Sequence, residues 1–356
     1  MTILRKVMLV VALSSALGPS ALGSQAVDTT RVRTAYAAVT ALRSDYEKTN
    51  GRFVTVNGIR MHYLEWGDKN GVPLVWAHGN ASSAYEIRAV APRLAQAGYR
   101  VLAVDYRGHG LTRVTDYDFT IHHIADDLIG LLDSLKISAA VFGGATKGGF
   151  VATAVYDHYP NRVLGLLMAD GGTWSRQWII DRESPEEARQ RRSDPIPQIT
   201  GVSEFDVFRQ VVGNIPAGDL PMERLFDMLM RIGPVDNGWA FLPAFDRLVA
   251  SNEAMASGLA RPTTLPPLQW SEQALIPRAV FRGLHVPMMI LDPQDARDVV
   301  PASDQNQRLA KDHPNLVIHR IYPETRDNVV RARPDWFVRD AVELLDEVRK
   351  RRSSRE

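Results

Sequence analysis

The sequence predicts an α/β protein with a mostly parallel, doubly wound sheet and an inserted helical cap. Short apolar runs alternate with amphipathic stretches from Val72 to Ala169, and the alternation resumes at Val286. Alternation of this kind is typical of parallel strands joined by crossover helices. Between these parts, residues 171–285 are richer in Trp, Met, Arg and Pro and show helical patches but no obvious buried strand. An insertion of this length between two sheet strands predicts a helical cap over one edge of the sheet.

Composition excludes several classes of function. The 356 residues are 45% hydrophobic, which is ample for one large core or for a core with a subdomain. A net charge of +1 argues against nucleic acid as the main partner, because there is no basic excess to neutralise phosphates. The chain has no cysteine, so disulfides, thiolate metal sites and a cysteine nucleophile are excluded. Without a metal or nucleotide motif, we expect no cofactor and no metal, and a small-molecule substrate or ligand under the cap.

The N-terminus has the order of a secretory signal peptide. Arg5 and Lys6 precede the apolar run of residues 7–17, and small residues follow up to Ala26. The run is short for a bilayer span, so we expect cleavage after residue 26 rather than an uncleaved anchor. The predicted location is therefore periplasmic or extracellular, with no membrane contact after cleavage.

The first elements after this peptide are a helix and a hairpin. The N-terminal segment 27–50 is predicted to be helical over residues 28–48. Strands are predicted at Arg52–Val56 and Arg60–Trp66, and the Asn57-Gly58 pair between them favours a tight hairpin turn, because both residues tolerate positive φ.

The main domain is predicted to comprise residues 51–170 and 286–352. Its further strands are expected at Pro73–Ala77, Tyr99–Asp105, Ala139–Gly143, Arg162–Ala169, Val286–Leu291 and Leu316–Tyr322. Its helices are expected at Ala84–Ala97, Ile121–Leu135, Lys147–His158 and Asp335–Arg351.

Three glycine-containing turns follow predicted strands. His78-Gly79-Asn80 follows the first buried strand, the segment 105–110 (Asp-Tyr-Arg-Gly-His-Gly) ends the second, and Gly144–Gly149 (Gly-Ala-Thr-Lys-Gly-Gly) follows the third. Open α/β sheets bind ligands at the carboxyl ends of their strands. We therefore expect these turns to lie together at the site.

These motifs, in this order and spacing, resemble the α/β-hydrolase fold family (AB hydrolase-1 type), and the resemblance covers roughly residues 51–350. The family shows an H-G-x turn, a D-x-R-G-x-G loop and a G-x-S-x-G-G nucleophile elbow. The resemblance implies that Thr146 occupies the nucleophile position, in an elbow whose tight turn needs Gly144, Gly148 and Gly149. It also implies an oxyanion hole made by the backbone amides of Asn80 and Lys147.

The acid position is filled in this sequence. Family members commonly carry G-x-x-D after the strand that corresponds to Val286–Leu291, which places the acid at Asp295 and puts Asp292 where glycine is usual. Asp298 is a nearby substitute, and Asp170 stands where some family members place their acid.

The histidine position is not filled by histidine. Counting back from Pro334 places Asp327 at the family's histidine and Arg326 at the preceding glycine. Aspartate has a reference pKa near 4, so it is poorly matched to proton transfer at neutral pH. Thr146 is β-branched, which is sterically costly at positive φ, and its secondary hydroxyl is a hindered nucleophile.

Other side chains are weaker candidates for the base. We expect His319 to be a sheet residue, and His78 and His109 to have structural roles in their loops. Lys147 adjoins the nucleophile position, but its side chain is expected to point away from the site.

Two functions remain open. The first is an exported hydrolase of small or medium esters or related substrates, acting through Thr146, Asp295 and Asp327. The second is a catalytically impaired pseudoenzyme or binding protein, because Thr146 and Asp327 replace the usual serine and histidine. The His78-Gly79-Asn80 turn also resembles the haloalkane dehalogenase and epoxide hydrolase branches, whose nucleophile is aspartate.

Overall fold

A computed structural model describes most of the chain after the N-terminal segment. The described residues are 29–175, 199–213, 221–235, 237–242, 266–295, 302–325 and 328–354. The predicted signal peptide, residues 1–26, lies outside them. Among the described residues, no helix has both the length and the apolar character required to cross a bilayer.

The core is an eight-stranded sheet with the order β1-β2-β4-β3-β5-β6-β10-β11. Its strands are β1 (Gly51–Val56), β2 (Ile59–Trp66), β3 (Val72–Ala77), β4 (Tyr99–Asp105), β5 (Ala140–Ala145), β6 (Val163–Ala169), β10 (Met288–Gln294) and β11 (Val317–Pro323). The pairs β1–β2 and β2–β4 are antiparallel, and the other neighbours are parallel. This order confirms the predicted doubly wound, mostly parallel sheet.

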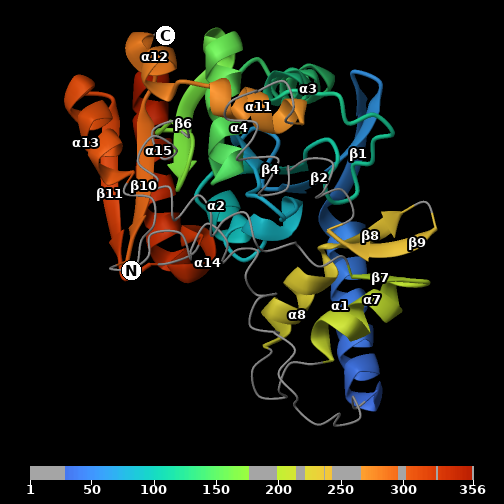
Figure 1. Ribbon diagram of the computed structural model, residues 1–356. Helices are drawn as coiled ribbons and strands as arrows, with labels where there is room; N and C mark the ends of the chain where they lie inside the picture. The colour runs from blue at the N-terminus through green and yellow to red at the C-terminus, as the bar shows by residue number, and fades with distance from the viewer. Residues whose placement is uncertain are drawn as a thin grey trace, which may run out of the picture.

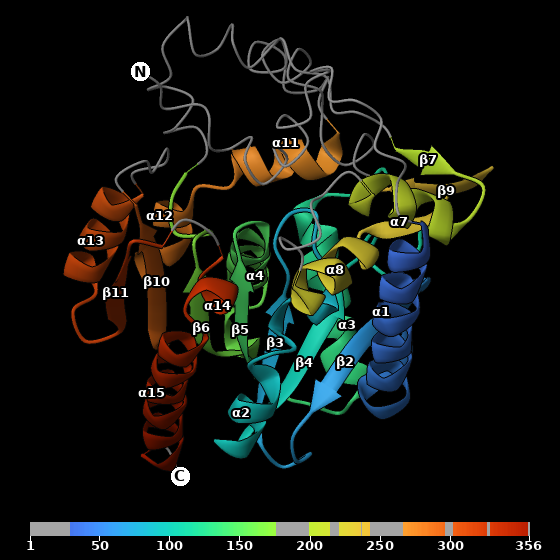
Figure 2. The same ribbon diagram turned by 90° about the horizontal axis from the view of Figure 1, so that it is seen from below.

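Helices cover both faces of this sheet, each over its own apolar core (Figure 2). One face packs against α3 (Ile121–Ser134), α4 (Lys147–His158) and α13 (Ser303–Asp312). The other face packs against α2 (Ala91–Gln96) and α15 (Pro334–Ser353). The helix expected over 84–97 is divided into a 3₁₀ turn, η2 (Ala84–Ile87), and α2, and a short α14 (Val329–Ala332) precedes α15.

The hairpin between β1 and β2 forms at the predicted turn. Val56 pairs with Ile59, so only Asn57 and Gly58 connect the strands. Their φ values are 46° and 78°, which is the left-handed conformation that this pair of residues tolerates.

The insertion is not purely helical, which corrects the prediction from the sequence. Its described helices are α7 (Glu204–Val212), α8 (Met222–Leu229), α11 (Pro267–Ala274) and α12 (Pro277–Val280), followed by the 3₁₀ turn η6 (Phe281–Gly283). A three-stranded antiparallel sheet, in the order β7-β9-β8, joins them: β7 (Thr200–Gly201), β8 (Ile232–Val235) and β9 (Gly238–Phe241). Strands of two to four residues are too short to show a clear period in the sequence.

The N-terminal helix α1 (Thr29–Asn50) connects the core and the insertion. Figure 1 shows α1 beside α7 and α8. Arg43 forms a bidentate pair with Glu204 of α7, at 2.7 and 2.9 Å, and the Tyr36 hydroxyl donates to the same carboxylate. One turn further along α1, the Glu47 carboxylate forms an ion pair with His62 of β2 at 3.2 Å.

A buried ionic network lies beneath the loops of the site. His62 Nδ1 donates to Asp105 Oδ2 at 2.7 Å, and both side chains are fully buried. Asp105 ends β4 and also accepts hydrogen bonds from the amides of Ala84 and Leu111, at 2.6 and 2.9 Å. The network therefore fixes the segments that follow β3 and β4.

Candidate active site

Thr146 lies in a strained turn between β5 and α4. Its φ and ψ are 46° and −109°, a conformation that a β-branched residue rarely adopts. Its amide donates to the carbonyl of Ala169 at 2.8 Å, and its carbonyl accepts from the amide of Gly149 at 3.0 Å. These bonds hold the hydroxyl at the carboxyl end of the central strands.

Close backbone contacts explain the glycines of this elbow. A Cβ at Gly148 would lie 1.9 Å from the carbonyl oxygen of Ala77, at the end of β3. A Cβ at Gly149 would lie 2.3 Å from the carbonyl oxygen of Gly171, in the loop after β6. Gly144 lies in β5, and a Cβ there would lie 2.3 Å from the backbone of Gly148. Side chains at these positions would force strand and helix apart.

The turn after β3 contacts the Thr146 hydroxyl. The Asn80 amide donates to Thr146 Oγ1 at 3.3 Å. The preceding amide, that of Gly79, donates to both oxygens of the buried Glu86 carboxylate at 3.2 Å, which fixes the turn. Lys147 is the first residue of α4, so its amide belongs to a helix N-terminus, where negative charge is favoured. The structure thus places both predicted oxyanion donors beside Thr146.

The Lys147 side chain is buried and faces the insertion. It is 2% exposed, and its Nζ lies 3.6 Å from Oε2 of the equally buried Glu272 on α11 of the insertion. Burial lowers the pKa values of His78 and His109, and the positive charge of Lys147 lowers them further. An ion pair between the elbow and the insertion therefore lies next to the candidate nucleophile.

Aromatic and histidine rings stack beside this ion pair. The His78 ring lies 4.1 Å from the Tyr106 ring at an interplanar angle of 13°, and the His109 ring lies 4.3 Å from Tyr106. Burial lowers the pKa of His78 to about 4, so this imidazole is neutral at physiological pH. The Nε2 atom of His78 and the Tyr106 hydroxyl are both buried without a hydrogen-bond partner among the described residues.

The predicted acids occupy different surroundings. Asp295 follows β10 directly and is half-buried, and its role as the acid stays a prediction. Asp292 accepts hydrogen bonds from His319 Nε2 at 2.7 Å and from Ser303 Oγ at 2.5 Å, so its carboxylate serves a separate contact between β10, β11 and α13. Asp170 follows β6, and its amide donates to the carbonyl of Leu291. The alternative acid Asp298 lies outside the described residues.

The base position remains a prediction. Asp327 and Arg326 lie outside the described residues. Among the described residues, which include all nine histidines, no histidine nitrogen forms a hydrogen bond with Thr146 Oγ1. His319 is a sheet residue, as expected, and it faces Asp292 rather than the elbow turn.

Two contacts of this region had no signal in the sequence. The Lys147–Glu272 pair joins residues 125 positions apart, and the His319–Asp292 pair joins two strands through side chains within the sheet.

Comparison with known proteins gives the same fold. A family model described as the alpha/beta hydrolase fold matches residues 72–202. Epoxide hydrolase A of Mycobacterium tuberculosis (strain ATCC 25618 / H37Rv) is 39% identical over 104 residues, which are 28% of this chain and 32% of that protein. The chain therefore matches about a third of that relative's length.

Solved structures resemble the chain over most of its length. A membrane phospholipase A, described as a bacterial virulence factor, superposes with a TM-score of 0.60 at 18% identity, over 96% of this chain and 98% of that one. E-2-(acetamidomethylene)succinate hydrolase superposes with a TM-score of 0.59 at 19% identity, over 83% of this chain and 98% of that one. At these identities the likeness concerns the fold.

Proposed function

Because the chain belongs to the α/β-hydrolase fold family, we propose that it is an exported hydrolase of small or medium esters or related substrates. The observation that carries the proposal is the 3.3 Å contact between the Asn80 amide and Thr146 Oγ1, at an elbow with φ of 46°. The contact supports a role for the Asn80 amide as an oxyanion donor, because it lies beside the nucleophile oxygen, and a backbone donor does not depend on the side chains that this sequence has changed.

In the proposed reaction Thr146 Oγ1 attacks the ester carbonyl carbon. The carbonyl oxygen becomes an oxyanion held by the amides of Asn80 and Lys147, and the hydroxyl proton passes to a carboxylate of Asp295 or Asp327. Collapse of the intermediate expels the alcohol, which takes up that proton. Water then hydrolyses the acyl-threonine, releasing the acid and restoring the hydroxyl.

Epoxide hydrolase chemistry is less well supported, although an epoxide hydrolase is among the relatives. That branch attacks with an aspartate, and position 146 is threonine. The threonine hydroxyl favours acyl transfer over opening of an epoxide by a carboxylate.

Labelling by a fluorophosphonate probe, together with hydrolysis of short-chain nitrophenyl esters, tests the proposal. We expect labelling and turnover in the native chain, loss of both in Thr146→Ala, and retention in Thr55→Ala, a matched change at an exposed threonine of β1. Faster turnover in Thr146→Ser is expected from its less hindered hydroxyl. Equal turnover in the native chain and Thr146→Ala would refute the assignment of the nucleophile.

A second candidate function is a pseudoenzyme that binds a ligand under the insertion. It is favoured by the absence of a histidine partner for Thr146 among the described residues. It predicts no labelling of the native chain but labelling of a Thr146→Ser, Arg326→Gly, Asp327→His variant. Turnover that is unchanged in Asp327→Ala would exclude Asp327 as a proton acceptor in either case.

Export is a separate part of the proposal and has its own test. We expect the mature protein to begin at Val27, after loss of the predicted signal peptide. N-terminal sequencing of protein from the medium or periplasm checks this, and a protein that retains residues 1–26 would contradict it.

A further inference from the structure

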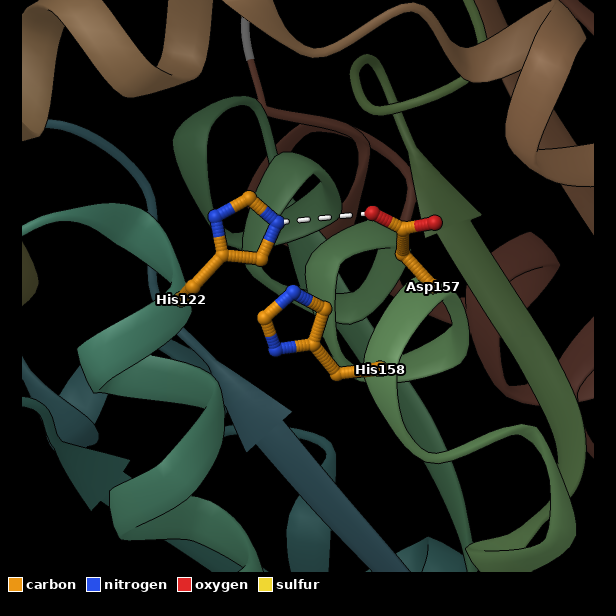
Figure 3. Close-up of side chains that lie close together, drawn as sticks. All are labelled: His122, Asp157 and His158. Atoms are coloured by element: carbon orange, nitrogen blue, oxygen red, sulfur yellow. Dashed lines mark ion pairs between the residues drawn. The ribbon is translucent and has the colours of Figure 1, made fainter.

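We infer that His122, Asp157 and His158 form a binding site for a divalent transition metal at the junction of α3 and α4. His122 is the second residue of α3, and Asp157 and His158 are the last two residues of α4. One potential ligand atom from each residue lies within 4.8 Å of the other two. The three side chains converge in Figure 3, where His122 and Asp157 form an ion pair.

The potential ligand atoms need to move only slightly closer together to coordinate one metal ion. His122 Nε2 lies 3.4 Å from Asp157 Oδ2, and the two imidazole rings lie 4.1 Å apart at an angle of 19°. In a tetrahedral site with bonds of roughly 2.0–2.1 Å, ligand atoms lie about 3.3 Å apart. The Asp157 and His158 side chains are exposed, so ring rotation and small shifts about their side-chain torsions can converge on one ion.

The donor set selects the class of metal. Two imidazole nitrogens and one carboxylate oxygen suit Zn²⁺, Co²⁺, Ni²⁺ or Cu²⁺, whereas Mg²⁺ and Ca²⁺ prefer oxygen ligands alone. Three protein ligands leave a coordination position open, as in metal sites that bind a further ligand.

That open position adjoins a pocket. A cavity of about 520 Å³ lies between the start of α3, the end of α4, α11 and α12. His122 and Asp157 line it together with Thr120, Trp270 and Ile276. Trp270 and Ile276 are 41% and 57% exposed, so the cavity combines metal ligands with accessible apolar surface. A metal-bound ligand would have room there.

The site is distinct from the elbow. Thr146 directly precedes α4, and His158 is the last residue of this helix. The first and last residues of α4, Lys147 and His158, lie about 17 Å apart along the helix axis. Neighbouring His123 does not join the cluster, because its Nδ1 accepts from the Thr120 amide in the cap of α3. The inference therefore does not depend on the proposed hydrolase function.

Calorimetric titration of the full chain with Zn²⁺ at about pH 8, where ordinary imidazoles are neutral, tests the inference. We expect one Zn²⁺ per chain at micromolar affinity, at least tenfold weaker binding in His122→Ala and His158→Ala, and unchanged binding in His313→Ala. Co²⁺ should give the visible absorption of a nitrogen-ligated ion, and millimolar Mg²⁺ should not compete.

A second measurement covers variants that fold poorly. Saturating Zn²⁺ should raise the thermal midpoint of the native chain and of His313→Ala by a few degrees, but not that of Asp157→Asn or His158→Gln. Native protein that binds no Zn²⁺, or cluster variants that bind it as tightly as the native chain, would overturn the inference.

Discussion

His62 should make the stability of this protein depend on pH in the alkaline range. Burial alone would lower its pKa, but hydrogen bonds to Asp105 and Glu47 and their negative charges outweigh burial and raise the pKa from 6.5 to about 9. Asp105 correspondingly has a lowered pKa. The native state therefore holds a proton that the unfolded chain releases near neutrality.

The size of the effect follows from the shift. A change of roughly 2.5 pKa units corresponds to about 3 kcal/mol of free energy of unfolding. Because the native pKa of His62 is raised, this stabilisation is complete below pH 6.5 and is lost as pH rises through about 9. Above that range His62 is neutral and no longer offsets the negative charge of the buried Asp105 carboxylate.

Urea unfolding of the native chain and of His62→Gln at about pH 6 and about pH 10 measures the effect. Groups distant from His62 also titrate between these values, but they contribute equally to both proteins and cancel in the difference. The stability difference between the two proteins should be about 3 kcal/mol larger at the lower pH. His313→Gln, at a histidine after α13, should show no such change.

A direct titration can refute the reasoning. NMR of the imidazole nitrogens should report a pKa of about 9 for His62. A value at or below 6.5 for His62, or a stability difference that does not vary with pH, would show that the two carboxylates do not hold the proton.

Three further changes test packing near the site. Gly149→Ala should lower the free energy of unfolding by about 3 kcal/mol, because the new Cβ would lie 2.3 Å from a backbone carbonyl oxygen. Gly283→Ala should be nearly neutral, because a Cβ at Gly283 would meet no atom within 4 Å. Equal losses of stability in chemical denaturation would contradict this explanation. Thr146→Gly should raise the thermal midpoint, since relief of about 1–3 kcal/mol of backbone strain exceeds the entropic cost of glycine, and a lower midpoint would argue against strain there. Asp127→Asn should lower the free energy of unfolding in urea by about 3 kcal/mol, because the buried carboxylate accepts two charged hydrogen bonds from Arg107, at 2.6 Å each. Asp133→Asn, at an exposed carboxylate paired with Arg162, should lower it by about 0.5 kcal/mol or less. Similar losses for the two variants would contradict the role of burial.

The sheet and the elbow could be predicted because their signals are local. Buried parallel strands appear as continuous apolar runs. The tight turns after these strands have no room for side chains, so glycines mark them in the sequence. The contact between Asn80 and Thr146 follows once the two turns are assigned to neighbouring strands, β3 and β5.

The remaining contacts depend on residues that meet only in the folded chain. Lys147 pairs with Glu272, and His122 meets Asp157, through packing between elements that no local period reveals. The small sheet of the insertion was missed because strands of two to four residues carry too few positions to show alternation.

The contacts of α1 couple the insertion to the sheet. Arg43 holds Glu204 of the insertion, and one turn further along the same helix Glu47 holds His62 of the sheet. Any displacement of α7 away from the sheet must either break the Arg43–Glu204 pair or carry α1 with it. In the second case the displacement pulls on Glu47, the partner of His62, so movement of α7 is coupled to the environment that keeps this histidine protonated.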